Sequence, residues 1–272
     1  MKIKNESQGK KQSQACKAYK VAYGGMPQEL DVEIPTEHVI RVMINDQPVM
    51  VLTCTPGSIV ELTVGRLFTE GLIRGMDDIS SIDLCEDSRN VCVTLRRRGT
   101  AFAKGVIERV DACGSITRNF AREQHDVPTS SFDAKSGVDP EWIFCMAGVF
   151  ANDTPLHYST LGVHSCSLFD GPVQLCSFED IGRHNAFDKA IGAALIEGMD
   201  LSKLAVFLSG RIPVDMIAKA IRAGISALVT KATPTTQAVA IARECGLVLI
   251  GRARPDSYYM FSGGQAPGKP YV

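Results

Sequence analysis

The sequence lacks any apolar run long enough to cross a membrane, and it lacks a strong charge of either sign. Its 272 residues carry 29 Lys and Arg against 30 Asp and Glu, so the formal net charge is −1. A spanning helix needs about 18 or more consecutive apolar residues. A chain without a net positive charge has no general attraction for nucleic acid or anionic lipid. We therefore expect no nucleic-acid partner and no membrane, and any anion site must come from locally placed arginines.

A secretory signal and a disulfide framework are also absent. Residues 1–17 are polar and rich in lysine, whereas a signal peptide carries an apolar stretch of about 7–15 residues. The nine cysteines are an odd number, which does not suggest a set of paired disulfides. These features favour a reducing, cytoplasmic location. The 45% hydrophobic content is enough for a full core.

The signature of the zinc deaminases, H-x-E followed by P-C-x-x-C, is missing as well. The chain has His164-Ser165-Cys166, and it reads P-V-Q-L-C from Pro172 to Cys176. The general-acid glutamate and the paired cysteines are therefore absent. His164, Cys166 and Cys176 are residue types that bind zinc, but their spacing argues against a site. We expect no metal centre, and a zinc-dependent hydrolase is the least favoured function.

Hydrophobic patterning divides the chain into three parts. Residues 1–30 have no periodicity and predict a mobile tail. Residues 31–135 predict a smaller β-rich N-terminal subdomain, and residues 136–272 predict an α/β domain. The expected class is α/β within an α+β arrangement overall.

One helix and two hairpins are predicted in the N-terminal subdomain. The helix is expected to start at Thr55-Pro56, with threonine as the cap and proline in the first turn, and to end at Gly71. The hairpin strands are expected at Val39–Ile44, Val49–Thr53, Ile82–Cys85 and Val91–Leu95.

The C-terminal part alternates strands and helices. Strand-like runs at Leu204–Leu208, Ile225–Val229 and Leu247–Ile250 are separated by segments with one apolar helical face. This β-α-β-α-β pattern predicts parallel strands, and ligands bind at the carboxyl ends of such strands. Those ends carry an anion-binding loop candidate and two further segments, namely Ser209-Gly210-Arg211, Thr230–Thr235 and Arg252-Ala253-Arg254.

The segment Glu179–Lys189 has a high density of ionisable side chains. Apolar residues from Asn185 onward follow helical spacing, so Asn185 is the expected N-cap. Arg183 and His184 then precede a helix N-terminus, which favours an anion such as phosphate. The alternative is a charged surface loop in which Glu179, Arg183 and Lys189 pair with one another.

This segment resembles the E-D-I-G-R-H-N-A-x-D-K signature of the FdhD family, the formate dehydrogenase accessory proteins. Further matches follow in the family's order and span about residues 53–254. They are Thr53-Cys54-Thr55-Pro56, Val64-Gly65, Glu70-Gly71, Ala112-Cys113-Gly114, Gly162-Val163-His164, Ser209-Gly210-Arg211, Pro234-Thr235, Ala238-Val239 and Leu249-Ile250-Gly251.

The resemblance implies a cytidine deaminase-like fold for the C-terminal domain. It also implies that one C-terminal segment contacts the molybdenum bis(molybdopterin guanine dinucleotide) cofactor as a bound cargo. That segment consists of Arg252, Ala253, Arg254, Pro255, Asp256 and Ser257. Together with the residue types above, the resemblance places six more residues at the cofactor site: His164, Arg183, His184, Asn185, Ser209 and Arg211.

The resemblance implies the most specific role for Cys113. On composition alone, a cysteine beside a glycine is a small buried apolar group. In the FdhD family this position carries sulfur, commonly within C-x-x-C, but Ile116 takes the second place here. A persulfide on one cysteine is compatible with this pattern, provided that the thiol is exposed and its pKa is lowered by nearby cations. A relay between two cysteines is put in doubt.

The resemblance thus implies a sulfurtransferase that acts as a persulfide carrier. Cys113 would take sulfur from a cysteine desulfurase and pass it to the molybdenum cofactor before insertion into formate dehydrogenase. A homodimer is expected by the same likeness. The alternative is a protein that binds and chaperones the cofactor without transferring sulfur.

Overall fold

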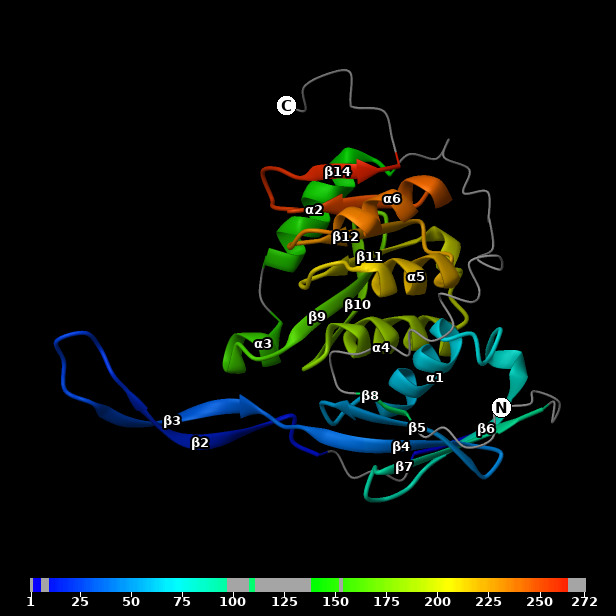
Figure 1. The fold of residues 1–272 in the computed structure, drawn as a ribbon, viewed down its shortest axis with the longest axis horizontal. Helices are drawn as coiled ribbons and strands as arrows, with labels where there is room; N and C mark the ends of the chain where they lie inside the picture. The colour runs from blue at the N-terminus through cyan, green and yellow to red at the C-terminus, as the bar shows by residue number, and fades with distance from the viewer. Residues whose placement is uncertain (1, 6–9, 97–107, 111–137, 152–153, 264–272) are drawn as a thin grey trace.

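The computed structural model describes residues 2–5, 10–96, 108–110, 138–151 and 154–263. Their strands form two six-stranded sheets and a two-stranded ribbon (Figure 1). The mixed α/β class is therefore confirmed, whereas the likeness to the cytidine deaminase fold stays a prediction. Among the described residues, no helix is both long enough and apolar enough to span a bilayer.

The N-terminal sheet has the strand order β1-β6-β7-β4-β5-β8. Both predicted hairpins are confirmed. Asn45 and Asp46 have φ angles of 47° and 65°, as the two-residue turns that suit twisted hairpins require. The strands are β1 (Lys2–Asn5), β4 (His38–Ile44), β5 (Gln47–Cys54), β6 (Ile79–Leu84), β7 (Asn90–Leu95) and β8 (Glu108–Val110), with a short 3-10 turn η1 (Met76–Asp78) before β6.

Helix α1 (Ile59–Thr69) packs its apolar residues against this sheet. The predicted start at Thr55 is wrong. Ser58 is the N-cap residue, and the Thr55 hydroxyl donates to the Glu179 carbonyl and the Asp180 carboxylate instead. The distant carboxylate outcompetes the local capping position for this hydroxyl.

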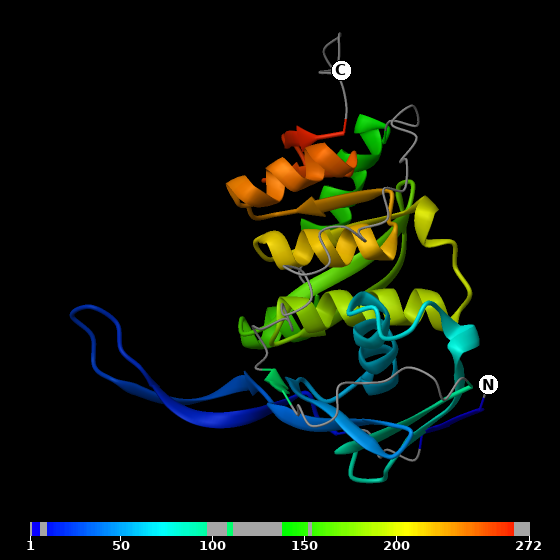
Figure 2. The same ribbon diagram turned by 45° about the vertical axis from the view of Figure 1, so that its right-hand side comes forward.

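The described residues among 1–30 form strands, which the absence of periodicity did not predict, and the mobility of this part stays a prediction. Strand β1 pairs with β6, and β2 (Ser13–Lys20) pairs with β3 (Gln28–Pro35) in an antiparallel ribbon that projects from the body (Figures 1 and 2). The boundary expected after residue 30 falls inside β3. No strand was predicted before residue 30 because β2 carries no regular apolar alternation.

The C-terminal sheet has the order β10-β9-β11-β12-β13-β14. Its central strands β11, β12 and β13 are parallel, which confirms the predicted alternating series. The strands are β9 (His164–Asp170), β10 (Val173–Asp180), β11 (Leu204–Leu208), β12 (Ala227–Thr230), β13 (Val248–Gly251) and β14 (Tyr259–Ser262), and a 3-10 turn η2 (Leu201–Lys203) leads into β11.

Helices cover both faces of the C-terminal sheet. One face packs against α4 (Arg183–Ile196), α5 (Val214–Ala223) and α6 (Thr236–Cys245). The other packs against α2 (Pro140–Ala151). The short α3 (Pro155–Thr160) lies beside the β2–β3 ribbon. Helix α4 lies between the C-terminal sheet and α1, so the α1–α4 contact joins the two halves of the molecule (Figure 2).

Glycines make this contact possible. A Cβ atom on Gly65 of α1 would lie 1.8 Å from the Asp188 carbonyl oxygen, and one on Gly192 of α4 would lie 1.9 Å from the Glu61 carbonyl oxygen. The two helix backbones therefore touch, and no other residue type fits at either position without moving a helix.

Candidate functional site

Helix α4 begins three residues earlier than the sequence suggested, because the expected N-cap was Asn185. Gly182 is the N-cap residue, and its N–H donates to Asp180 Oδ1 at 2.9 Å. Asn185 is buried in the first turn. Its amide nitrogen donates to the Thr53 carbonyl at 2.8 Å and to Asp180 Oδ1 at 2.9 Å, and its oxygen accepts from Arg66 Nη2 at 3.0 Å. Asn185 therefore joins α4 to the N-terminal half of the protein through hydrogen bonds, and its role at a cofactor stays a prediction.

Asp188 is the centre of a buried charge network between the two halves. Its carboxylate lies 2.8 Å from Arg66 Nε and 3.0 Å from Lys219 Nζ, and it accepts from the Thr69 hydroxyl at 2.7 Å. Glu70 lies 3.2 Å from Lys219 Nζ. Because removing one member of a buried pair leaves the other charge unpaired, such a network is costly to break.

Lys189 extends the network on the other side of α4. Its ammonium pairs with Asp180 at 2.8 Å and donates to the Thr55 hydroxyl at 2.9 Å. Glu179 instead accepts the N–H groups of Leu156 and His157 at the start of α3. The alternative of a charged surface loop, in which Glu179, Arg183 and Lys189 pair with one another, is therefore wrong, and most of the signature segment joins the two halves of the fold.

Arg183 and His184 lie in the first turn of α4 and not in a loop before it. His184 is fully buried, and its Nε2–H donates to Asp215 Oδ2 at 2.9 Å. Its Nδ1 and the Nε of Arg183 are buried without a hydrogen-bond partner. His184 thus points into the protein, and Arg183 is the group of this segment closest to the strand ends.

His164 and Ser209 meet Arg183 at the end of β11. His164 Nδ1 lies 3.4 Å from Ser209 Oγ. A Cβ atom on Gly210 would lie 3.1 Å from His164 Nδ1 and 3.3 Å from the Arg183 side chain. A larger residue at this position would push these side chains apart by a few tenths of an ångström. The structure therefore brings together three of the predicted site residues, His164, Arg183 and Ser209.

Buried histidines give the stability of the fold a pH dependence. Burial is the largest cause lowering the pKa of His38, His164 and His184 below the ordinary value, and the Asp215 hydrogen bond partly opposes it at His184. The unfolded chain therefore binds protons first as the pH falls through about 6.5. The contribution of these histidines to the free energy of unfolding is therefore fully present above that pH and is lost progressively as the pH falls below it.

We expect the urea midpoint to fall between about pH 7.5 and about pH 5.5, a window set by the ordinary histidine pKa. The variant His184→Asn should show a shallower fall, because one buried imidazole no longer resists protonation. Urea unfolding at both pH values measures this. An unchanged pH slope in the variant would show that His184 does not contribute.

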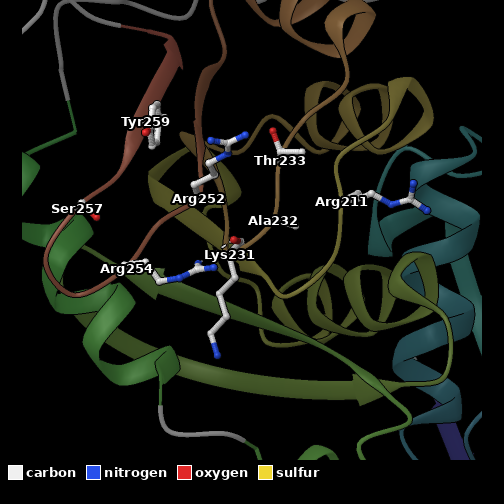
Figure 3. A pocket seen from close by; sticks show the side chains of 8 residues that line it. All are labelled: Arg211, Lys231, Ala232, Thr233, Arg252, Arg254, Ser257 and Tyr259. Carbon is white, nitrogen blue, oxygen red and sulfur yellow. Dashed lines mark hydrogen bonds between the residues drawn. The ribbon is translucent and has the colours of Figure 1, made fainter.

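A basic pocket of about 460 Å³ lies at the carboxyl ends of the parallel strands (Figure 3). The Arg252 guanidinium lies 5.2 Å from the ring centroid of Tyr259. Arg254 Nη1 donates to the Lys231 carbonyl at 2.8 Å. The pocket is lined by Arg211, Lys231, Ala232, Thr233, Arg252, Arg254, Ser257 and Tyr259.

Several predicted residues do not contribute to this pocket as expected. Ala253 is buried in the core, and Pro255 and Asp256 are exposed on the loop but absent from the lining. The Arg211 side chain lines the pocket, yet its guanidinium extends away from Arg252 and Arg254 (Figure 3).

The predicted strand-end segment Thr230–Thr235 supplies Lys231, Ala232 and Thr233 to the lining, although no role was assigned to them individually. Tyr259 was not predicted from the sequence, and no local signal pointed to it. It reaches the pocket because β14 folds back and pairs it with Gly251.

Residues 112–114, which include Cys113, lie outside the described residues. Burial raises the pKa of the Cys54 thiol to about 12 and that of Cys176 to about 11, and it raises the pKa of Cys166 strongly. These thiols are poor nucleophiles at neutral pH. Within the described ranges, no group of three or more His, Cys, Asp or Glu is placed to hold a metal ion.

Comparison with known proteins supports one family. A model of the FdhD/NarQ family matches residues 35–266. The sulfur carrier protein FdhD of Bacillus subtilis is 31% identical over 228 residues, covering 84% of this chain and 87% of that protein. The protein of the same name from Bacillus licheniformis is 30% identical over 260 residues, covering 93% and 97%.

A solved structure has the same fold. It is described as a candidate formate dehydrogenase accessory protein from Desulfotalea psychrophila. It is 24% identical, with a TM-score of 0.73, and the match covers 95% of this chain and 99% of that one.

Proposed function

Because the chain belongs to the FdhD/NarQ family, we propose that it is a sulfur carrier that serves formate dehydrogenase. The sulfur donor is a cysteine desulfurase, and the acceptor is the molybdenum bis(molybdopterin guanine dinucleotide) cofactor before its insertion into the enzyme. The protein acts as a cytoplasmic homodimer. The names of the relatives support the carrier role in general, and the donor, cofactor, assembly and location are parts of the proposal.

The single observation that carries the cofactor assignment is the basic pocket at the strand ends. Its volume of about 460 Å³ is within the range of small-molecule sites. Arg252 and Arg254 supply guanidinium groups, which suit phosphate oxygens. The Tyr259 ring, already stacked with Arg252, offers a face for a planar base. These residues fit one nucleotide end of a dinucleotide cofactor as cargo.

The sulfur step follows from thiolate chemistry. The Cys113 thiolate attacks the outer sulfur of the desulfurase persulfide, a new S–S bond forms on Cys113, and the desulfurase cysteine leaves as a thiolate. Release of that sulfur to the metal as sulfide takes two electrons. Because Ile116 replaces the second cysteine, an external thiol displaces the sulfide and forms a mixed disulfide with Cys113, and a second external thiol then frees Cys113 and leaves as the disulfide of the two.

Arg252→Ala should weaken binding of GDP, a probe for the nucleotide end, by about tenfold or more, since a charge-assisted contact contributes roughly 1.5–3 kcal/mol. Arg211→Ala should have a smaller effect, because its guanidinium extends away from the other arginines (Figure 3). Calorimetric titration of both variants at fixed salt measures this. Equal affinities of wild type and Arg252→Ala would exclude Arg252 from the site.

Incubation with a cysteine desulfurase and cysteine tests the carrier role directly. Intact-mass analysis should find one added sulfur, and peptide mapping should place it on Cys113. The missing second cysteine favours one rival function, a chaperone that binds the cofactor without carrying sulfur. That protein would bind GDP and gain no sulfur under the same conditions.

A further inference from the structure

The ribbon formed by β2 and β3 projects from the body of the protein (Figures 1 and 2). A ribbon of two strands is at most marginally stable in water without a packing partner. Strand β3 lies beside α3, and a Cβ atom on Gly162, just after α3, would lie 2.9 Å from the Pro35 ring. The body therefore supports the base of the ribbon and leaves the projecting part for another partner.

The ribbon has two different faces, because successive residues of a strand point to opposite sides. The register places Cys16 opposite Val32 and Ala18 opposite Leu30, so these four residues share one face. We call it the apolar face of the ribbon. It consists of Cys16, Ala18, Leu30, Val32 and Ile34, with Gln14, Lys20 and Gln28 at its polar ends.

The opposite face is charged. Lys17 stands opposite Asp31, and its ammonium lies 3.1 Å from Glu29. The side chains of Lys17 and Glu29 are 78% and 47% exposed. Charged groups at this exposure are best left in water. A partner of the ribbon therefore meets the apolar face.

The apolar face and the tip of the ribbon are open to solvent. All five residues of the apolar face are partly or fully exposed. At the tip, Val21 and Met26 are 68% and 89% exposed, and Tyr23 is fully exposed. Apolar side chains gathered on an exposed surface mark a site of protein interaction.

The sizes of the side chains make the apolar face complementary to a second copy of itself. Strand β3 contributes the large Leu30, Val32 and Ile34. Strand β2 contributes the small Cys16 and Ala18. When two copies meet face to face about a two-fold axis along the strands, β2 of one copy lies over β3 of the other. Large side chains then pack against small ones, as close-packed layers require.

The charges of the two strands favour the same arrangement. Strand β2 carries Lys17 and Lys20 and no acidic residue. Strand β3 carries Glu29, Asp31 and Glu33 and no basic residue. The two-fold axis along the strands places the basic strand of one copy along the acidic strand of the other. Pairing of identical strand edges would instead bring like charges together, which is unfavourable.

We propose that the apolar face of the ribbon is the surface through which two copies of this chain bind each other. The inference rests on the homodimer proposed above and names its interface, and it does not depend on sulfur transfer. Strands of eight residues extend about 26 Å, and two of them are about 10 Å wide. This face is smaller than the roughly 800 Å² that each partner buries in a standard interface. The dimer should therefore dissociate on dilution.

Ala18→Asp tests the proposal, and Ala15→Asp is its matched control. Both change an alanine of β2 to the same residue, but Ala18 lies on the apolar face and Ala15 on the charged face. The control places its new charge opposite Glu33, so it carries the larger penalty for the ribbon itself. In sedimentation velocity over a dilution series, the control should dimerise nearly as wild type. Ala18→Asp should raise the dissociation constant about tenfold or more, because a carboxylate would be buried without a partner.

Alkylation of Cys16 provides a second measurement, which reports the contact itself. Cys16 should react severalfold more slowly in the concentrated wild-type protein than in the dilute protein or in Ala18→Asp. The exposed Cys85 and Cys145 give reference rates in the same sample. A wild-type chain that stays monomeric at every concentration would overturn both the homodimer and this interface. A dimer that Ala18→Asp forms as readily as wild type would overturn the ribbon interface alone.

Discussion

Cys113→Ser is expected to abolish activation of formate dehydrogenase while leaving the fold and GDP binding intact. A serine hydroxyl cannot form or hold a persulfide, so no sulfur should reach the cofactor. The buried thiols of the described chain should not replace Cys113. Burial raises the pKa of Cys166 strongly and that of Cys176 to about 11. A strain that lacks the native carrier, complemented with each variant, gives the measurement.

The matched controls are Cys166→Ser and Cys176→Ser, which should retain sulfur transfer if they fold. Ile116→Cys should be tolerated, since the second cysteine can release the sulfur as sulfide while a disulfide with Cys113 forms, and external thiols then reduce that disulfide before the next turnover. Full activation by Cys113→Ser would refute the carrier mechanism and leave the cofactor chaperone as the function.

The strand ends could be predicted from sequence because the signals are local. Leu204–Leu208 is an uninterrupted apolar run, and the structure places β11 on those residues. Parallel strands joined by helices bring their carboxyl ends to one edge. The meeting of Arg252, Arg254 and Ser257 in one pocket follows from that rule.

The signature segment could not be interpreted from sequence because its partners are distant. The local sequence predicts Asn185 as a helix cap. In the structure its side chain is hydrogen-bonded to the Thr53 carbonyl and to the Arg66 guanidinium, which lie 132 and 119 positions away in the sequence. Asp188 likewise pairs with Arg66 and Lys219. The hydrophobic periodicity of a sequence carries no information about such long-range pairings. The dense run of charged residues therefore forms an interface between the two halves, which the sequence did not predict, and its role in cofactor binding stays a prediction.

This interface also gives the segment a structural role beside the strand ends. Helix α4 carries Arg183 next to Gly210 and, further along, Asp188 and Lys189 in the buried network. Holding α4 against α1 therefore fixes where Arg183 meets His164 and Gly210. The N-terminal half positions Arg183 through this helix.

Gly65→Ala should be the most damaging small substitution in the described chain. The added methyl would lie 1.8 Å from the Asp188 carbonyl oxygen and 2.6 Å from its carbon. Both atoms belong to the backbone of α4, so no side chain can rotate away, and the helices must separate. Separation would strain the ion pairs that Asp188 makes with Arg66 and Lys219. Overpacking costs about 1–3 kcal/mol where side chains adjust, and we expect a loss of about 3 kcal/mol or more here.

Gly148→Ala is the matched control, because it is also a glycine-to-alanine change within a helix. A Cβ atom on Gly148 of α2 would meet no atom within 4 Å. Alanine favours a helix over glycine by roughly 0.5–1 kcal/mol, so this variant should be slightly more stable than wild type. Urea unfolding of the two variants gives opposite shifts of the midpoint if α1 and α4 touch through their backbones. Equal shifts would show that the helices are not in that contact, and the positioning of Arg183 through α4 would then lose its physical basis.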